Sequence, residues 1–163
     1  MEKIAIFVDV QNIYYTVRDG LKGQFDYNAF WAKVTGSDTE VVAAYAYAIN
    51  RNDQKQIQFQ NILRGIGFKV KLKPYISRND GSSKGDWDVG ITIDMLEVAP
   101  SVDRLILLSG DGDFDLLVNN LISKNKRVDV FGVPQLTADS LMKSATNFIP
   151  IDQSLLLPSK GKV

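Results

Sequence analysis

Short apolar runs alternate with longer amphipathic segments along most of this chain. The runs Ile4-Ala5-Ile6-Phe7-Val8 and Leu105-Ile106-Leu107-Leu108 contain no polar position, as expected of strands that are buried on both faces. The pattern predicts strands at 3–9, 40–49, 68–75, 104–108, 127–131 and 147–150. It predicts helices at 12–19, 27–35, 52–65, 87–98, 113–124 and 137–144, and a loop at 77–85.

This alternation of strands and helices predicts the α/β class. Short connections favour a mostly parallel, doubly wound sheet with helices on both faces, which is a three-layer α/β/α sandwich. We expect a single domain at residues 1–150 and a loosely docked C-terminal tail at 151–163. The carboxyl ends of parallel strands meet at one edge of such a sheet, and open α/β sheets bind their ligands there.

The composition narrows the chemistry that this edge can support. The 163 residues include no cysteine and no histidine. Disulfides and a histidine general base are therefore excluded, and zinc, which favours N and S ligands, is disfavoured. The apolar runs are too short to cross a membrane, and the N-terminus lacks the apolar region of a signal peptide. We expect a cytoplasmic protein that does not contact membranes.

The formal net charge is zero, but the charges are unevenly distributed. Residues 51–84 hold eight Lys or Arg against two Asp, a balance of +6, and residues 85–115 hold one Arg against seven Asp and one Glu, a balance of −7. Solvated faces of helices and strands would account for this pattern. A basic segment beside an acidic one also suits a polyanion that is held by basic side chains while metal ions bind the acids.

The first buried strand ends in an acidic residue, Asp9, and Asn12 follows one helical turn later. Both residue types are favoured as helix N-caps, but one cap explains only one of them. The two together indicate a metal ligand and a group that orients a phosphate or a water molecule.

Three more acids, Asp111, Asp113 and Asp115, follow the strand at 104–108. On a helix that begins near Gly112, Asp111 and Asp115 lie one turn apart and face the same point, while Asp113 points elsewhere or caps the helix. A calcium loop of the EF-hand type is excluded, because it would place glycine and glutamate where this chain has Leu116 and Ile122.

The helix at 87–98 opens with Asp86 and Asp88, in the turn where the helix dipole stabilises carboxylates even without a metal. Asp94 lies in the apolar part of this helix, where a charge without a partner is costly. We expect Asp88 to be a ligand, Asp94 to support the site, and Trp87 to be a packing residue rather than a platform for a base.

Other common sites find no support in the sequence. The loop at 81–85 is not a Walker loop, and no GxGxxG motif follows a strand. A haloacid-dehalogenase-type phosphohydrolase would need an acid at the position of Gln11. What remains is Mg²⁺ or Mn²⁺ held by carboxylates, which can activate water against a phosphodiester without a protein base.

Three motifs together resemble the NYN domains, in the LabA-like (DUF88) branch of the PIN-like nuclease group. They are Phe7-Val8-Asp9-Val10-Gln11-Asn12, Lys84-Gly85-Asp86-Trp87-Asp88 with Asp94, and Ser109-Gly110-Asp111-Gly112-Asp113-Phe114. The similarity covers residues 3 to about 150. It implies a PIN-like α/β/α sandwich and divalent-metal-dependent cleavage of RNA.

The resemblance assigns roles to individual positions. Asp9 and Asn12 match the first motif, Asp88 matches the acid of the second, and Asp111 matches the strand-end acid of the third. Asp115 stands where related nucleases place a further acid. Asp86 departs from the family pattern, which is more often apolar there, so it adds a ligand or caps the helix.

These observations lead to one functional expectation and one alternative. We expect a ribonuclease that acts on single-stranded or loop RNA, with Asp9, Asp88, Asp111 and Asp115 as ligands of Mg²⁺ or Mn²⁺ and, with Asn12, as the catalytic groups. The expected substrate contacts are Asn12, Lys71, Lys73, Arg78, Lys84 and Ser109, and the supporting acids are Asp86, Asp94 and Asp113. The alternative is a catalytically silent module whose acidic pocket binds RNA or serves a protein partner. A homodimer is compatible with either of these two functions.

Overall fold

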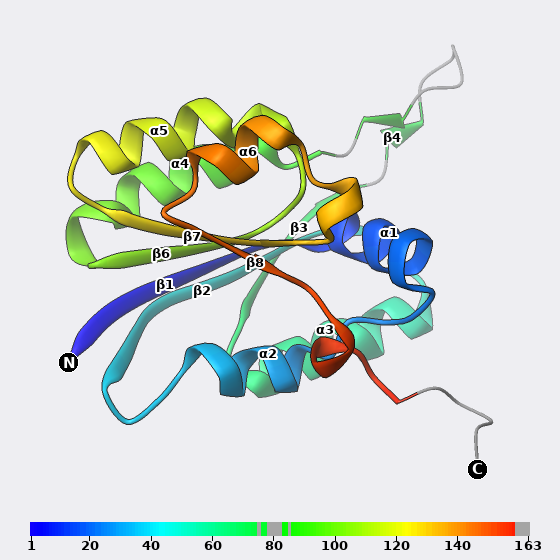
Figure 1. Ribbon diagram of the computed structural model, residues 1–163. Coiled ribbons are helices and arrows are strands. Elements are labelled where there is room, and N and C mark those ends of the chain that lie inside the picture. The colour runs from blue at the N-terminus through cyan, green and yellow to red at the C-terminus, as the bar shows by residue number, and fades with distance from the viewer. Residues whose placement is uncertain (75, 78–82, 85, 159–163) are drawn as a thin grey trace.

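The chain forms a six-stranded, all-parallel sheet in the order β3-β2-β1-β6-β7-β8 (Figure 1). The computed structural model describes residues 1–74, 76–77, 83–84 and 86–158. The strands of the sheet are β1 (Glu2–Asp9), β2 (Thr39–Asn50), β3 (Lys69–Pro74), β6 (Arg104–Leu108), β7 (Arg127–Gly132) and β8 (Asn147–Pro150). A separate antiparallel pair, β4 (Ile76–Ser77) and β5 (Ser83–Lys84), lies beyond β3 in the chain.

Helices cover both faces of this sheet, which confirms the predicted three-layer α/β/α class (Figure 1). One layer contains α1 (Val10–Leu21), α2 (Tyr27–Val34) and α3 (Gln54–Ile66), and the other contains α4 (Asp88–Val98), α5 (Asp115–Ser123) and α6 (Asp139–Ser144). Single 3₁₀ turns are η1 (Ala99–Ser101), η2 (Gly112–Phe114), η3 (Pro134–Leu136) and η4 (Gln153–Leu155). Among the described residues, none of the helices is both long and apolar enough to cross a membrane.

The central strand β1 divides the interior into two hydrophobic cores. Ile4, Ile6 and Val8 pack into the core beneath α1, α2 and α3, while Ala5 and Phe7 pack into the core beneath α4, α5 and α6. All five side chains are completely buried. Because successive side chains of a strand point to opposite faces, burial of both faces requires the uninterrupted apolar run that the sequence shows.

The last described residues pack against the domain. Ile151 and Leu155 are buried, and the carbonyl of Leu155 accepts a hydrogen bond from the Asp26 N–H at 2.8 Å. A β-bridge joins Leu156 to Phe25. In its described part, to residue 158, the segment expected as a loose tail is therefore docked beside α2, where apolar side chains hold it.

The strand order reverses between β1 and β6, which creates a topological switch point at the carboxyl edge of the sheet. From β1 the chain continues outward to β2 and β3 on one side, and β6, β7 and β8 extend on the other. The helix after β1 and the helix after β6 lie on opposite faces (Figure 1). Their loops separate at the switch between β1 and β6, which is the position where open α/β sheets bind ligands.

Candidate metal centre

Asp9 is the last residue of β1 and stands at this switch point, directly before α1. Its carboxylate accepts a hydrogen bond from the Ser109 hydroxyl at 3.2 Å. Burial raises the pKa of Asp9 to about 6, and the nearby charges of Asp111 and Asp86 add to this effect. The Ser109 hydroxyl and the backbone of Asn12 oppose it, because they favour the ionised form. Asp9 is thus a partly buried acid, and among the described residues no Lys or Arg forms an ion pair with it.

The loop after β6 connects Asp9 to the other acids. Ser109 is completely buried, and besides donating to Asp9 its hydroxyl accepts the Asp111 N–H at 3.1 Å. The next residue is Gly110, where a Cβ atom would lie 2.6 Å from the Leu136 carbonyl oxygen. Only glycine fits this close approach. Ser109 therefore positions two acids, which differs from the expected substrate contact because no part of its side chain reaches solvent.

Three acids from two segments converge beside this loop. Asp88, the first residue of α4, meets Asp111 and Asp113, and one carboxylate oxygen of each lies within 4.8 Å of the others. Asp88 and Asp111 are partly buried, whereas Asp113 is exposed. The Asp111 carboxylate also accepts the Asp113 N–H at 2.9 Å, which fixes the turn between them. Such a group of oxygens can surround a hard cation.

The electrostatics of Asp88 reflect this crowding. Burial raises the pKa of Asp88 to about 7, and the charge of Asp111 together with a carboxyl–carboxyl hydrogen bond to Asp111 adds to the rise. The charges of Asp86 and Asp9 contribute in the same direction. Asp9 therefore lies within electrostatic reach of the group formed by Asp88, Asp111 and Asp113. A cation bound at this point would relieve the mutual repulsion of these carboxylates.

Two further acids are placed differently from the others. Asp115, expected to face the same point as Asp111, is not in the group, and Asp113 takes that place. The reason is local: the chain makes the 3₁₀ turn η2 before α5 begins, and the tighter turn brings positions 111 and 113 together. Asp86 is exposed, and its carboxylate accepts the N–H of Asp88, the first residue of α4, at 3.2 Å.

Asn12 joins α1 to the loop after β6. Its side-chain oxygen accepts the Gly110 N–H at 2.9 Å across 98 residues of sequence. The amide therefore has a structural contact that the sequence did not predict. Its Nδ2 group is the part that remains to donate to a ligand.

Asp94 belongs to a different cluster, between α4 and the sheet. Its carboxylate accepts hydrogen bonds from the Lys71 ammonium at 2.6 Å and from the Tyr47 hydroxyl at 2.7 Å. Burial and this carboxylate raise the pKa of Tyr47, so the hydroxyl remains a donor. Lys71 also lies 4.1 Å from the centre of the Tyr45 ring. Asp94 and Lys71 thus neutralise each other, in place of the supporting role at the metal and the contact with RNA expected for them.

The remaining basic candidates are Lys73, Lys84 and Arg78. The Lys73 ammonium donates to the Asp86 carbonyl at 3.1 Å and lies 4.5 Å from the Trp87 ring. Trp87 in turn donates to the Ala48 carbonyl at 2.9 Å, so it anchors the start of α4 as a packing residue. Lys84 lies in β5, and Arg78 lies outside the described residues. Lys73 therefore lies beside the start of α4, next to Asp86 and Trp87.

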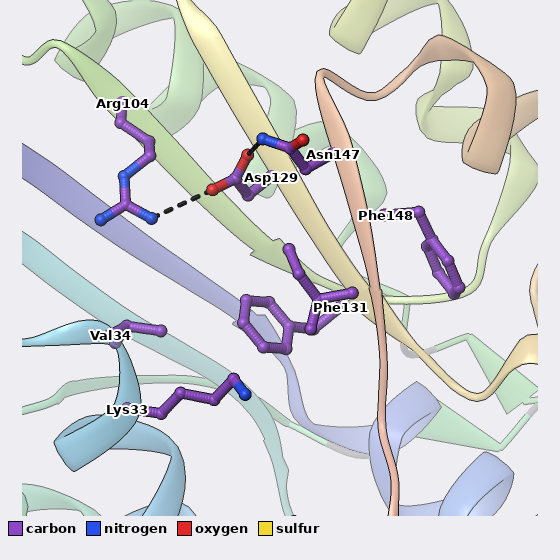
Figure 2. A pocket seen from close by; sticks show the side chains of 8 residues that line it. Lys33, Val34, Arg104, Asp129, Phe131, Asn147 and Phe148 are labelled. Carbon is purple, nitrogen blue, oxygen red and sulfur yellow. Dashed lines mark hydrogen bonds and ion pairs between the residues drawn. The ribbon is translucent and has the colours of Figure 1, made fainter.

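A shallow cavity lies away from these acids, toward the amino ends of β6, β7 and β8 (Figure 2). Lys33 and Phe131 are part of its lining. Figure 2 shows Asp129 between Arg104 and Asn147, and each donates to one of its carboxylate oxygens, both at 3.0 Å. Asp129 is 4% exposed and paired, so we regard this cluster as structural.

The structure is a doubly wound α/β domain with three carboxylates gathered beside the loop after β6, which is consistent with the PIN-like class that the three motifs imply. The NYN domain family model matches residues 3–152, and the chain belongs to the NYN domain family. The family is part of the PIN-like nuclease superfamily, which agrees with the resemblance seen in the three motifs.

Individual relatives support this assignment. The chain is 27% identical over 160 residues to the low amplitude and bright protein LabA of Synechococcus elongatus, covering 92% of this chain and 84% of that protein. A crystal structure of a protein of unknown function from Vibrio parahaemolyticus is 60% identical, with a TM-score of 0.90 over 96% of both chains. Ribokinase from Giardia lamblia has a TM-score of 0.50 at 12% identity, over 92% of this chain and 58% of ribokinase, which shows similarity of fold alone.

Proposed function

We propose that this domain is a divalent-metal-dependent ribonuclease that hydrolyses phosphodiester bonds. The observation that carries the proposal is the convergence of Asp88, Asp111 and Asp113, with Asp9 beside them, at the switch point of an NYN domain. The donor set fits Mg²⁺ or Mn²⁺, because it consists of carboxylate oxygens close enough to share one ion. RNA as the substrate is inferred from membership of the family.

Some residues of the site would bind the ion, and others would position the acids or contact the substrate. Asp88, Asp111 and Asp113 would bind the ion, with Asp9 as a further ligand on the β1 side. Asp115 lies outside this group and is kept only as the further acid that the family resemblance implies. The bound ion supplies activation of a water molecule and stabilisation of negative charge on the scissile phosphate. Ser109 keeps Asp9 and Asp111 at a fixed separation. The Nδ2 group of Asn12 donates to a phosphate oxygen.

The basic side chains near the acids would hold the RNA backbone. Lys73 lies beside Asp86, Lys84 lies in β5, and Arg78, which is outside the described residues, remains an expected contact from the sequence. Lys71 is neutralised by Asp94, so its contribution to binding phosphates is smaller. We therefore expect Lys73, Lys84 and Arg78 to contribute most of the loss of RNA binding at high salt.

The test compares cleavage of RNA by the wild type, Asp9→Asn and Asp111→Asn. We expect cleavage in Mn²⁺ or Mg²⁺, no cleavage with a chelator, and losses of about 10²-fold or more in both variants, the scale of losing an electrostatic contact to the transition state. Asp38→Asn is the matched control, because Asp38 is exposed and lies outside the acidic group. It should cleave at the wild-type rate.

Binding of Mn²⁺, measured by calorimetry, separates the two functional classes. A wild type that binds Mn²⁺ and RNA through Asp111 but never cleaves RNA would support a catalytically silent module. Equal cleavage by the wild type and folded Asp111→Asn would refute the proposed site. Circular dichroism of each variant establishes that the domain is folded.

A further inference from the structure

One exposed face of α1 carries two adjacent aromatic side chains. Tyr14 is 55% exposed and Tyr15 is 37% exposed. Their rings meet edge to face, with centroids 5.2 Å apart and planes at 77°. Neither ring belongs to the two hydrophobic cores, so packing of the domain does not account for them.

A cation completes this aromatic surface. The guanidinium carbon of Arg18 lies 5.6 Å from the Tyr14 ring centre and 4.8 Å from that of Tyr15. Asp19 accepts a hydrogen bond from Arg18 Nε at 2.9 Å, which helps to hold the guanidinium over the rings. The face therefore combines flat π surfaces with a guanidinium plane that is ion-paired to Asp19, and all of these groups are exposed to solvent.

The helix that carries this face starts at the proposed metal centre. The helix α1 begins directly after Asp9, and Tyr14, Tyr15 and Arg18 recur three and four residues apart, so they share one flank. At 1.5 Å per residue, Tyr15 lies about 9 Å along the helix axis from Asp9. A strand with one phosphate at the acids can place a neighbouring base on the tyrosines.

We propose that Tyr14, Tyr15 and Arg18 form a base-stacking subsite for an unpaired nucleotide next to the cleavage position. This inference rests on the proposed nuclease function and adds a requirement for single-stranded substrate. Every base has a π face that stacks on tyrosine or on a guanidinium plane, so the subsite accepts any sequence. A perfect duplex buries those faces in its own stack and cannot use it.

The experiment measures affinity by fluorescence anisotropy and cleavage by gel, both with Mn²⁺. The proteins are the wild type, Y14A/Y15A, Y14F/Y15F and Ile62→Ala. Ile62 is the matched control, because it is a 56% exposed apolar residue on α3. The ligands are a single-stranded RNA, the same backbone without bases, and a perfect duplex.

We expect Y14A/Y15A to bind the single strand about 10- to 100-fold more weakly than the wild type does. Y14F/Y15F should recover most of this loss, because the rings remain. Ile62→Ala should bind like the wild type. The base-free backbone should bind equally to all four proteins, since it has nothing to stack.

The two proposals fail separately. Unchanged affinity of Y14A/Y15A for the single strand, or an equal loss on the base-free backbone, would overturn the stacking subsite. So would a wild type that binds no single strand or prefers the duplex. Tyrosine-dependent binding without any cleavage would leave the subsite standing and refute the nuclease. Normal cleavage with a normal KM in Y14A/Y15A would refute the stacking subsite and leave the nuclease proposal standing.

Discussion

At the scale of single residues, Asp9 joins the function of the site to the stability of the domain. Burial is the main reason that its pKa rises from 3.8 to about 6, and Asp111 and Asp86 contribute further. The folded state therefore binds the Asp9 proton more tightly than the unfolded chain does. Below about pH 3.8 both states are protonated, and above about pH 6 both are ionised. Between these two pH values, Asp9 is ionised only in the unfolded state.

An acid whose pKa is higher in the folded state than in the unfolded state makes the domain less stable as the pH rises. Without metal, the free energy of unfolding should fall as the pH rises from about 4 to 6, by roughly 2–3 kcal/mol from Asp9. Asp88, whose pKa is raised to about 7, acts in the same direction up to that pH. Urea unfolding with a chelator between pH 4 and 8 measures this slope. Asp9→Asn should flatten it, Asp38→Asn should not, and equal slopes in all three would contradict the assignment.

Gly110 sets the spacing of the acids. A methyl group there would lie 2.6 Å from the Leu136 carbonyl, so Gly110→Ala must displace one of the two loops. We expect a loss of about 1–3 kcal/mol in the free energy of unfolding, typical of overpacking, together with weaker binding of Mn²⁺. Calorimetry and urea unfolding measure both. Gly36→Ala is the control, because a Cβ there meets nothing within 4 Å. Unchanged Mn²⁺ affinity in Gly110→Ala would show that the acids do not depend on this loop.

At the scale of elements, the contacts between α4 and the edge of the sheet determine where Asp88 stands. Asp94 in the second turn of α4 is bound to Lys71 of β3 and Tyr47 of β2. Trp87, just before α4, is hydrogen-bonded to the backbone of β2. The first two turns of α4 are thus fixed to two strands, and Asp88 lies between these attachment points.

The Lys71–Asp94 ion pair should accordingly stabilise the folded state more than an exposed ion pair does. Its side chains are 25% and 18% exposed, so either Asp94→Asn or Lys71→Met leaves a poorly solvated charge. We expect each to lower the free energy of unfolding by about 1–3 kcal/mol, less than for a fully buried pair. The double variant should cost less than the sum of the two. Asp19→Asn, in the exposed pair with Arg18, should leave urea unfolding unchanged. Strict additivity of the two substitutions would argue against the pair.

At the scale of the whole molecule, the sequence predicted what depends on periodicity. The apolar runs indicated the parallel sheet, and the acids after β1 and β6 indicated its carboxyl edge, because these features follow from strand geometry. The choice of Asp113 over Asp115 depended on a 3₁₀ turn, and helical spacing alone cannot reveal that turn. The pairing of Lys71 with Asp94 joins positions 23 residues apart, and no local pattern encodes it.

The convergence of distant segments leads to a prediction for the entire domain. Asp9, Asp88 and Asp111 come from three regions that only folding brings together, so the unfolded chain should bind Mn²⁺ far more weakly. At a concentration 100 times Kd, binding to the folded state alone adds about 2.7 kcal/mol to the free energy of unfolding. For a domain of this size that raises Tm by about 5–10 °C.

Differential scanning fluorimetry at pH 7.5, with ionic strength matched by NaCl, measures this rise in Tm. Asp38→Asn should retain it and Asp111→Asn should lose most of it, although removing one of the crowded acids also relieves their mutual repulsion in the ion-free protein. The informative quantity is therefore the difference in Tm between Mn²⁺ and chelator within each variant. An equal difference in the wild type and Asp111→Asn would mean that the ion binds elsewhere on the surface, and that the acids at the switch point serve another purpose.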